Sequence, residues 1–220
     1  MRRFLSYAFT ILLVTLCWPL AARADYFVWQ DAGTGMSLTF PDTWQRANNI
    51  DADDIVTLLA PSGRENAMCR VRMRPEGRFL IYPPGFASDI QKTTYNADFW
   101  MDYLTEYFYP QLYIAQDTAG LGRAFAGYAE ASYWSTRPGP MMPRHGLMFA
   151  ALYNGRAYVL ECSSHADAFD RWKAAFLSVA KSVDFPKAYH ELVQGNYPRN
   201  FTGDSRMIFR SPDNDAATTY

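Results

Sequence analysis

Cysteine and histidine are the residue types in this chain whose spacing could support nucleophilic chemistry. Cys162 lies three residues before His165, and an imidazole beside a thiol can hold it as a reactive thiolate. The alternative is a disulfide between Cys162 and Cys69, because an even pair of cysteines in an oxidising compartment is usually bonded. We expect the Cys69–Cys162 disulfide and no catalytic residue. An envelope enzyme that uses Cys162 and His165 is the rival hypothesis.

A second group of residues could bind a metal. Met141, Met142 and His145 lie in a proline-rich segment, and two thioethers with one imidazole suit Cu(I). Adjacent methionines beside prolines are more often an apolar loop tip, and the three histidines of the chain lie far apart. We expect no metal site and no cofactor, and we assign Met141, Met142 and His145 to a surface that docks a partner. A Cu(I)-binding protein is the alternative.

Charged residues recur on the strands that the sequence predicts. Glu130 and Glu161 could form the carboxylate pair of a glycosidase, but the sequence does not supply their separation, and we expect both to face solvent. Alternation along residues 68–74 places three arginines on one face of a strand. We expect this face to be solvated, with the arginines balanced by nearby aspartates. The residues concerned are Arg70, Arg72 and Arg74, and Asp51, Asp53 and Asp54.

Residues 79–113 contain eleven aromatic side chains. Asn96 can cap a helix that runs to about Phe108. Tyr82 and Phe86 precede this helix in a loop with two prolines and a glycine, and aromatic side chains on an ordered loop can dock a sugar, a peptide or a protein. The alternative is that the aromatic side chains only cover the sheet. We assign Tyr82 and Phe86 to the partner-docking surface.

The first 24 residues have the pattern of a secretory signal peptide. Arg2 and Arg3 give a charged start, an apolar run follows over residues 8–18, and residues 22–24 (ARA) form a small-x-small cleavage site. We expect this segment, residues 1–24, to be removed. The mature chain would then begin at Asp25 and work in the periplasm or outside the cell.

Charge and hydropathy argue against two classes of protein. The leader carries three arginines and no acidic residue, while the whole chain has a formal net charge of -1, so the mature chain is acidic. It therefore lacks the basic surface of a nucleic-acid-binding protein. No later apolar run approaches the roughly 20 residues that cross a bilayer. We expect a soluble mature protein that is not embedded in a membrane.

Apolar residues recur at two periods along the chain. Asn154-Gly155 lies between two apolar runs and is the strongest hairpin signal, whereas Ser164 and Asp167 form a capping box before an amphipathic helix that ends near Ser182. Strands are expected at 36–40, 55–60, 68–74, 112–116, 124–134, 147–153 and 156–162. This order predicts an α+β fold, in which an antiparallel sheet is flanked by helices.

Three short segments resemble those of a known fold family. Residues 38–44 (LTFPDTW), the Asn154-Gly155 hairpin, and the helix and tail over 169–185 are similar to the PsbP-like fold. That family includes photosystem II extrinsic proteins, a Ran-binding import factor and small bacterial envelope proteins. The resemblance covers about residues 26–186 and implies an α/β/α sandwich.

The resemblance also implies a class of function. The PsbP-like family has no common catalytic residues, and its understood members mostly bind and stabilise other proteins. We expect one sandwich domain at 25–186, with a polar and partly disordered extension at 187–220. The predicted function is that of an exported, non-catalytic accessory protein, which docks a protein partner or envelope component through the residues assigned above.

Overall fold

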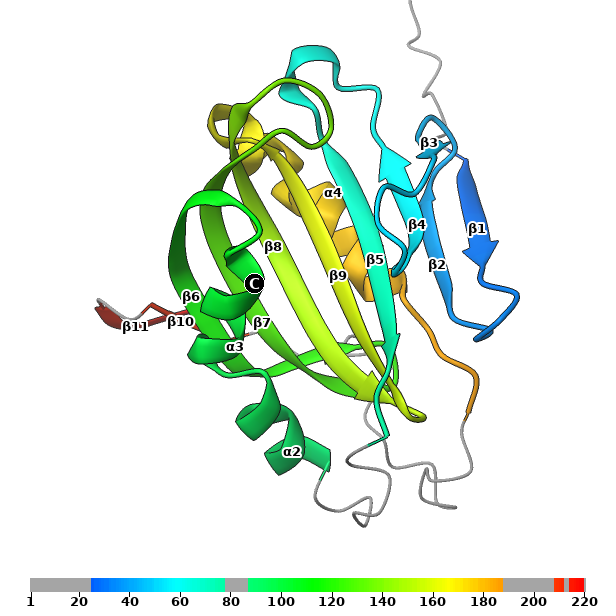
Figure 1. The fold of residues 1–220 in the computed structure, drawn as a ribbon, viewed down its shortest axis with the longest axis vertical. Coiled ribbons are helices and arrows are strands. Elements are labelled where there is room, and N and C mark those ends of the chain that lie inside the picture. The colour runs from blue at the N-terminus through cyan, green and yellow to red at the C-terminus, as the bar shows by residue number, and fades with distance from the viewer. Residues whose placement is uncertain (1–24, 78–86, 188–207, 212–213, 220) are drawn as a thin grey trace, which may run out of the picture.

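The computed structural model describes residues 25–77, 87–187, 208–211 and 214–219. Its centre is a seven-stranded antiparallel sheet with the strand order β3-β4-β5-β9-β8-β7-β6 (Figure 1). The strands are β3 (Gln45–Ala47), β4 (Asp54–Leu59), β5 (Met68–Pro75), β6 (Phe108–Leu121), β7 (Ala124–Ser135), β8 (Met142–Tyr153) and β9 (Arg156–His165). With helices on both faces, the structure confirms the predicted α+β class.

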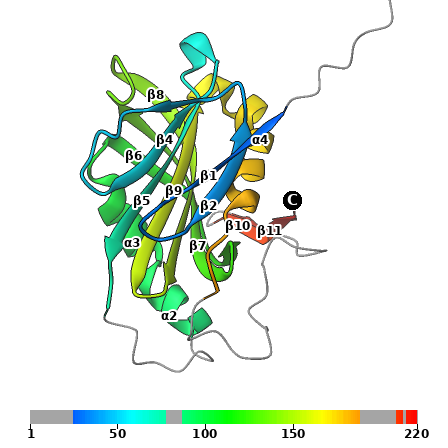
Figure 2. The same ribbon diagram turned by 90° about the vertical axis from the view of Figure 1, so that its right-hand side faces the viewer.

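Different elements cover the two faces of the sheet (Figure 2). Helix α4 (Phe169–Ser182) and the hairpin of β1 (Tyr26–Gln30) and β2 (Ser37–Pro41) pack on one face. Helices α2 (Ala87–Thr94) and α3 (Ala97–Leu104) pack on the other. Two short 3-10 helices, η1 (Gly63–Glu65) and η3 (Ala166–Ala168), and a hairpin of β10 (Ile208–Ser211) and β11 (Asn214–Thr219) complete the described elements.

Strand alternation divides the core into two parts. On β9, Leu160 and Cys162 belong to the cluster beneath α4, while Val159 belongs to the cluster beneath α3. Successive side chains of a strand point to opposite faces, so Glu161 shares the α3 face with Val159. The α3 face therefore holds both an apolar cluster and charged residues.

Two sequence predictions concern the centre of the sheet. Asn154 and Gly155 have φ angles of 47° and 72°, as a two-residue turn with positive φ requires, and they join β8 to β9 at the pair Tyr153–Arg156. Cys69 on β5 lies directly opposite Cys162 on β9, and their sulfurs are bonded. The predicted hairpin and the predicted disulfide are both present.

The structure confirms the predicted start of α3 at Asn96 and the predicted end of α4 at Ser182, but the other boundary of each helix differs. Helix α3 begins after the Asn96 cap but ends at Leu104 rather than near Phe108, because Phe108 already pairs in β6. Before α4, the Nδ1 of His165 accepts the backbone N–H of Asp167 at 3.3 Å, so the predicted capping box of Ser164 is wrong. Among the described residues, no helix is both long enough and apolar enough to cross a membrane.

Candidate functional site

Arg70 and Arg72 are buried, which corrects the expectation that the arginine face of β5 is solvated. They are 3% and 5% exposed, because α3 and the turn after it pack over this face. Arg74, two residues further along β5, keeps 73% of its side chain exposed. The sequence pattern identified the shared face correctly, but it could not show that a helix would cover two of the three side chains.

Glu161 is also buried, at 3% exposure, and the Glu130 side chain is only 12% exposed, so the expectation that both face solvent is wrong. Glu161 lies opposite Arg70 across β5 and β9, and the Nε and Nη2 of Arg70 donate to its Oε2 at 3.1 and 2.9 Å. The hydroxyls of Tyr103, Tyr107 and Tyr133 donate to the same carboxylate at 3.0, 2.8 and 2.6 Å. One buried carboxylate is thus surrounded by donors from β5, β7, α3 and the turn after α3.

Arg72 continues this network toward the edge of the sheet. Its Nη2 donates to Asp51 at 2.7 Å, its Nη1 to Glu106 at 2.9 Å and its Nε to Asp54 at 3.3 Å. The carboxylates of Asp51, Asp53 and Asp54 lie within 4.8 Å of one another, and each forms an ion pair with at least one arginine. The predicted balance between arginines and aspartates is therefore present, although it is formed largely inside the protein.

The network holds its groups in fixed charge states. Burial alone would raise the pKa of Glu161, but the charge of Arg70 and the Tyr133 hydroxyl outweigh it and bring this pKa to about 2. Burial and the charge of Glu161 raise the pKa values of Tyr103, Tyr107 and Tyr133. A general acid or base works best with a pKa near the operating pH. These shifts favour a structural network over proton transfer at neutral pH.

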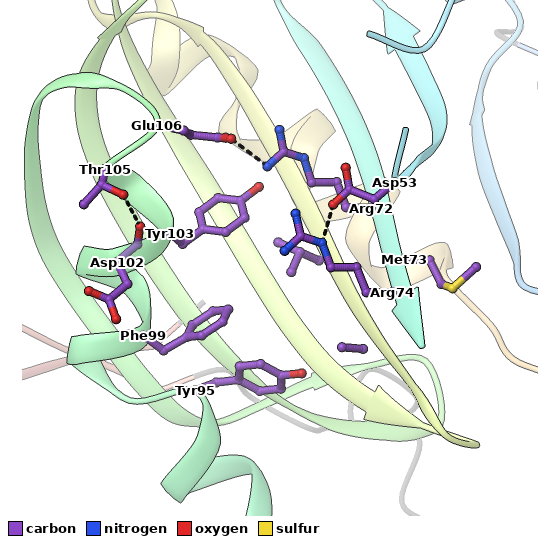
Figure 3. A pocket seen from close by; sticks show the side chains of 12 residues that line it. Asp53, Arg72, Met73, Arg74, Tyr95, Phe99, Asp102, Tyr103, Thr105 and Glu106 are labelled. Carbon is purple, nitrogen blue, oxygen red and sulfur yellow. Dashed lines mark hydrogen bonds and ion pairs between the residues drawn. The ribbon is translucent and has the colours of Figure 1, made fainter. Parts of the chain in front are cut away.

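A cavity of about 270 Å³ lies beside this network, between α3 and strands β5 and β9 (Figure 3). We call it the α3–β5 pocket. One wall consists of aromatic rings from α3 and the turn before it, the opposite wall carries two arginines, and the floor is formed by small apolar side chains of β9. These residues are Tyr95, Phe99 and Tyr103, then Arg72 and Arg74, then Ala157 and Val159; Asp53, Met73, Asp102, Thr105 and Glu106 complete the lining.

The aromatic wall is a packed unit. The ring centroids of Tyr95 and Phe99 are 4.7 Å apart with an interplanar angle of 69°, and those of Phe99 and Tyr103 are 6.2 Å apart at 28°. Behind Tyr95 lies Gly127 of β7, where an added Cβ would be 2.5 Å from the Cβ of Tyr95. The wall therefore rests directly on the sheet, and its position depends on the missing side chain of Gly127.

Arg74 lies at the mouth of the pocket. Its Nε donates to Asp53 at 2.6 Å, and in Figure 3 its guanidinium points from β5 toward α3. Burial alone would raise the pKa of Asp53, but its hydrogen bond and charge interaction with Arg74 lower it. The bond through Nε leaves the Nη atoms at the pocket mouth, where a guanidinium can bind a carboxylate with two parallel hydrogen bonds.

The remaining predicted site residues are those of the partner-docking surface. Tyr82 and Phe86 lie outside the described residues. Met141 is 49% exposed, whereas the sulfur of Met142 is 3.6 Å from the Nδ2 of Asn66. Docking of a protein partner through Tyr82, Phe86, Met141, Met142 and His145 stays a prediction.

Neither alternative chemistry gains a site from the structure. Met142 and His145 are three residues apart on β8 and so point to opposite faces, and His145 packs against Phe169 of α4. They therefore do not converge on one Cu(I) ion. Cys162 is held in the disulfide with Cys69 and offers no thiol to His165.

No family model and no curated protein sequence matches the chain. Similar solved structures include CyanoP, a cyanobacterial PsbP from Synechocystis, with a TM-score of 0.45 and 16% identity over 77% of this chain and 97% of that one. The fold resembles that of PsbP. LpqN, described as involved in cell envelope biogenesis of Mycobacterium tuberculosis, matches with a TM-score of 0.43 and 11% identity over 74% of this chain and 92% of that one.

A third similar structure is a protein of unknown function from Pseudomonas aeruginosa, with a TM-score of 0.38 and 13% identity over 74% of this chain and 98% of that one. These similarities concern the fold, and the residues of the α3–β5 pocket have to be interpreted from their own geometry.

Proposed function

We propose that this protein is an exported accessory protein that binds a small ligand in the α3–β5 pocket and performs no chemistry there. The observation that carries the proposal is the contrast between two neighbouring regions. The buried charges behind the pocket satisfy one another, while the pocket itself is open, with an aromatic wall facing Arg74. Mostly apolar cavities with a few convergent polar groups are the usual form of a ligand site.

The lining of the pocket defines the class of ligand. Phe99 and the rings beside it suit a flat apolar body. Three carboxylates also line the pocket, but Asp53 is paired with Arg74 and Glu106 with Arg72, so the Nη atoms of Arg74 suit an anionic group at the mouth. A volume of about 270 Å³ lies just below the range of about 300–1,000 Å³ that holds drug-sized molecules. The proposed ligand is accordingly a carboxylate that carries a single aromatic ring or an apolar group of similar size.

Two features support export. The first 24 residues have the pattern of a cleaved signal peptide, and Cys69 is bonded to Cys162. Disulfides persist in oxidising compartments such as the periplasm. Cells that produce the protein should therefore export a chain whose N-terminus is Asp25. Edman sequencing or the intact mass of the exported protein measures this, and a retained leader would contradict the proposal.

Calorimetric titration with three probes tests the pocket. Phenylpropionate has both proposed features, phenylpropylamine reverses the charge, and propionate lacks the ring. We expect phenylpropionate to bind most tightly and the exposed substitution Arg74→Gln to weaken it at least about tenfold, or about 1.4 kcal/mol. Equal binding of phenylpropionate and phenylpropylamine would reject the carboxylate at Arg74.

A pair of matched variants tests the location. Ala157→Phe places a ring on the floor of the pocket, whereas Ala47→Phe makes the same change on edge strand β3, at another partly buried alanine. Ala157→Phe should abolish binding of phenylpropionate, and Ala47→Phe should leave it unchanged. Binding that survives Ala157→Phe would place the ligand elsewhere and reject the proposed function.

A further inference from the structure

A second polar cluster lies on the opposite face of the sheet, beside α4. Ser132 on β7 and His145 on β8 are in contact, with 2.7 Å between the serine Oγ and the histidine Nδ1. The other ring nitrogen, Nε2, lies 2.9 Å from the Oε1 of Glu130, also on β7. A hydroxyl, an imidazole and a carboxylate are thus joined in series, which is the order of groups that activates a serine nucleophile.

The sheet itself produces this arrangement. Ser132 and His145 are direct partners in the β7–β8 register, so their side chains lie opposite each other on the same face. Glu130 precedes Ser132 by two residues and points to that same face. No short sequence motif records the cluster, because two of its members lie on one strand and the third comes from the neighbouring strand.

The charge of Glu130 determines which nitrogen carries the proton. Burial alone would raise the pKa of Glu130, but the His145 hydrogen bond and the charge of Lys173 lower it, so the carboxylate is ionised near neutral pH. An ionised carboxylate only accepts hydrogen bonds. The Nε2–H of neutral His145 therefore donates to Glu130, and its Nδ1 accepts the hydroxyl proton of Ser132.

Aromatic rings hold the imidazole in place. The ring centroid of His145 lies 5.4 Å from that of Tyr113, nearly parallel at 20°, and 4.1 Å from that of Phe169. The site is partly accessible, since Ser132 is only partly buried, the His145 side chain is 19% exposed, and the neighbouring Tyr113 and Trp134 are 43% and 42% exposed. An aromatic group of a substrate could stack on these rings beside the serine.

We propose that Ser132 is a nucleophile that accepts the acyl group of aryl esters, with His145 as its base and Glu130 orienting that base. This activity goes beyond ligand binding in the α3–β5 pocket and does not depend on it. In the acylation step Oγ bonds to the ester carbon while its proton passes to Nδ1. The bond from that carbon to the aryl oxygen breaks, and the imidazolium returns the proton to the departing phenoxide. Water hydrolyses the acyl-serine through the same base.

The expected rate increase at Ser132 follows from the groups that surround this serine. Ser132 is paired with Gln111 of β6 on one side and with His145 of β8 on the other, so its backbone lies within the sheet ladder. Activation then rests on the base, and general-base assistance contributes roughly a 10²–10⁴-fold rate increase. We expect a slow esterase, with a serine that reacts at least about 100-fold faster than an ordinary one.

Labelling with a fluorophosphonate tests the proposal directly. The reagent forms a bond from phosphorus to Oγ and releases fluoride, and peptide mass spectrometry identifies the modified serine. We expect one adduct, on Ser132, which is lost in Ser132→Ala and slowed at least about tenfold in Glu130→Gln. The control is Ser62→Ala, because Ser62 is partly buried and its hydroxyl bonds to backbone groups of Ala60 and Ala67 rather than to a histidine. That variant should label like the unmodified protein.

Nitrophenyl acetate provides the second readout, with circular dichroism as the test that each variant is folded. Hydrolysis should fall to the buffer rate in Ser132→Ala, while phenylpropionate binding stays unchanged. The proposal is overturned if Ser132 labels no faster than Ser62, or if folded Ser132→Ala retains its esterase rate. Loss of phenylpropionate binding with intact labelling would instead count against the pocket alone.

Discussion

The substitution Glu161→Gln should lower the free energy of unfolding at neutral pH by about 3 kcal/mol. Two independent arguments give this magnitude. The pKa of Glu161 falls from 4.5 to about 2 on folding, and each unit corresponds to about 1.4 kcal/mol, which gives about 3 kcal/mol. Removing one partner of a buried ion pair costs about 3–5 kcal/mol. The lower end applies, because Arg70 keeps its bond to Glu106 at 2.7 Å.

The same lowered pKa predicts a pH dependence. Above pH 4.5 the carboxyl group is ionised in both the folded and unfolded chain, so its contribution is fully present. Between pH 4.5 and about 2 the unfolded chain takes up a proton that the folded chain does not, and stability falls as the pH falls. Glu161→Gln has no such proton, so its stability should change about 3 kcal/mol less across this window.

Urea denaturation measured at intervals from neutral pH down to pH 2 provides the assay. Glu65→Gln is the control, since it makes the same change at a carboxylate that is 34% exposed, and its effect should be much smaller. If Glu161→Gln at neutral pH lies within about 0.5 kcal/mol of the unmodified protein, the range of ordinary surface substitutions, the buried network does not stabilise the fold as argued.

Two further predictions concern packing and the disulfide. Gly127→Ala should lower the free energy of unfolding by about 1–3 kcal/mol and also weaken phenylpropionate binding, because the new Cβ displaces Tyr95. Thermal denaturation measures the first effect and calorimetry the second. Unchanged binding would show that the position of the aromatic wall does not affect the pocket. Replacing Cys69 and Cys162 together by alanine should cost about 4–5 kcal/mol, given their separation of 93 residues, and a loss below about 2 kcal/mol in urea denaturation would contradict this.

Local patterns predicted the sheet well. Asn154-Gly155 determined a turn that needs two positive φ angles, and alternation along residues 68–74 assigned Arg70, Arg72 and Arg74 to one face correctly. The pairing of Cys69 with Cys162 followed from their number and from the expected export. Each of these inferences needed only residues close together in the sequence or the number of cysteines.

The sites depended on contacts between distant segments. Arg70 is buried because α3 lies over β5, and Glu161 meets it because β5 pairs with β9, which is 91 residues away in the chain for this pair. Nothing in the local sequence distinguishes these charges from solvated ones. The alignment of Ser132 with His145 was in principle accessible, since it follows once β7 and β8 are paired in register. The proline-rich segment between those strands left that register undetermined.

The pairing of β5 with β9 has a consequence for the order in which the sheet can be completed. Strands β3, β4 and β5 come from the early part of the chain, and the strand that pairs with β5 is the last one of the central sheet to be synthesised. Cys69 can bond to Cys162 only after β9 has been made, and until then the edge of β5 that pairs with β9 has no partner strand. The disulfide can therefore close only a chain that is complete through Cys162, and a chain truncated before Cys162 would lack both the bond and the strand that pairs with β5.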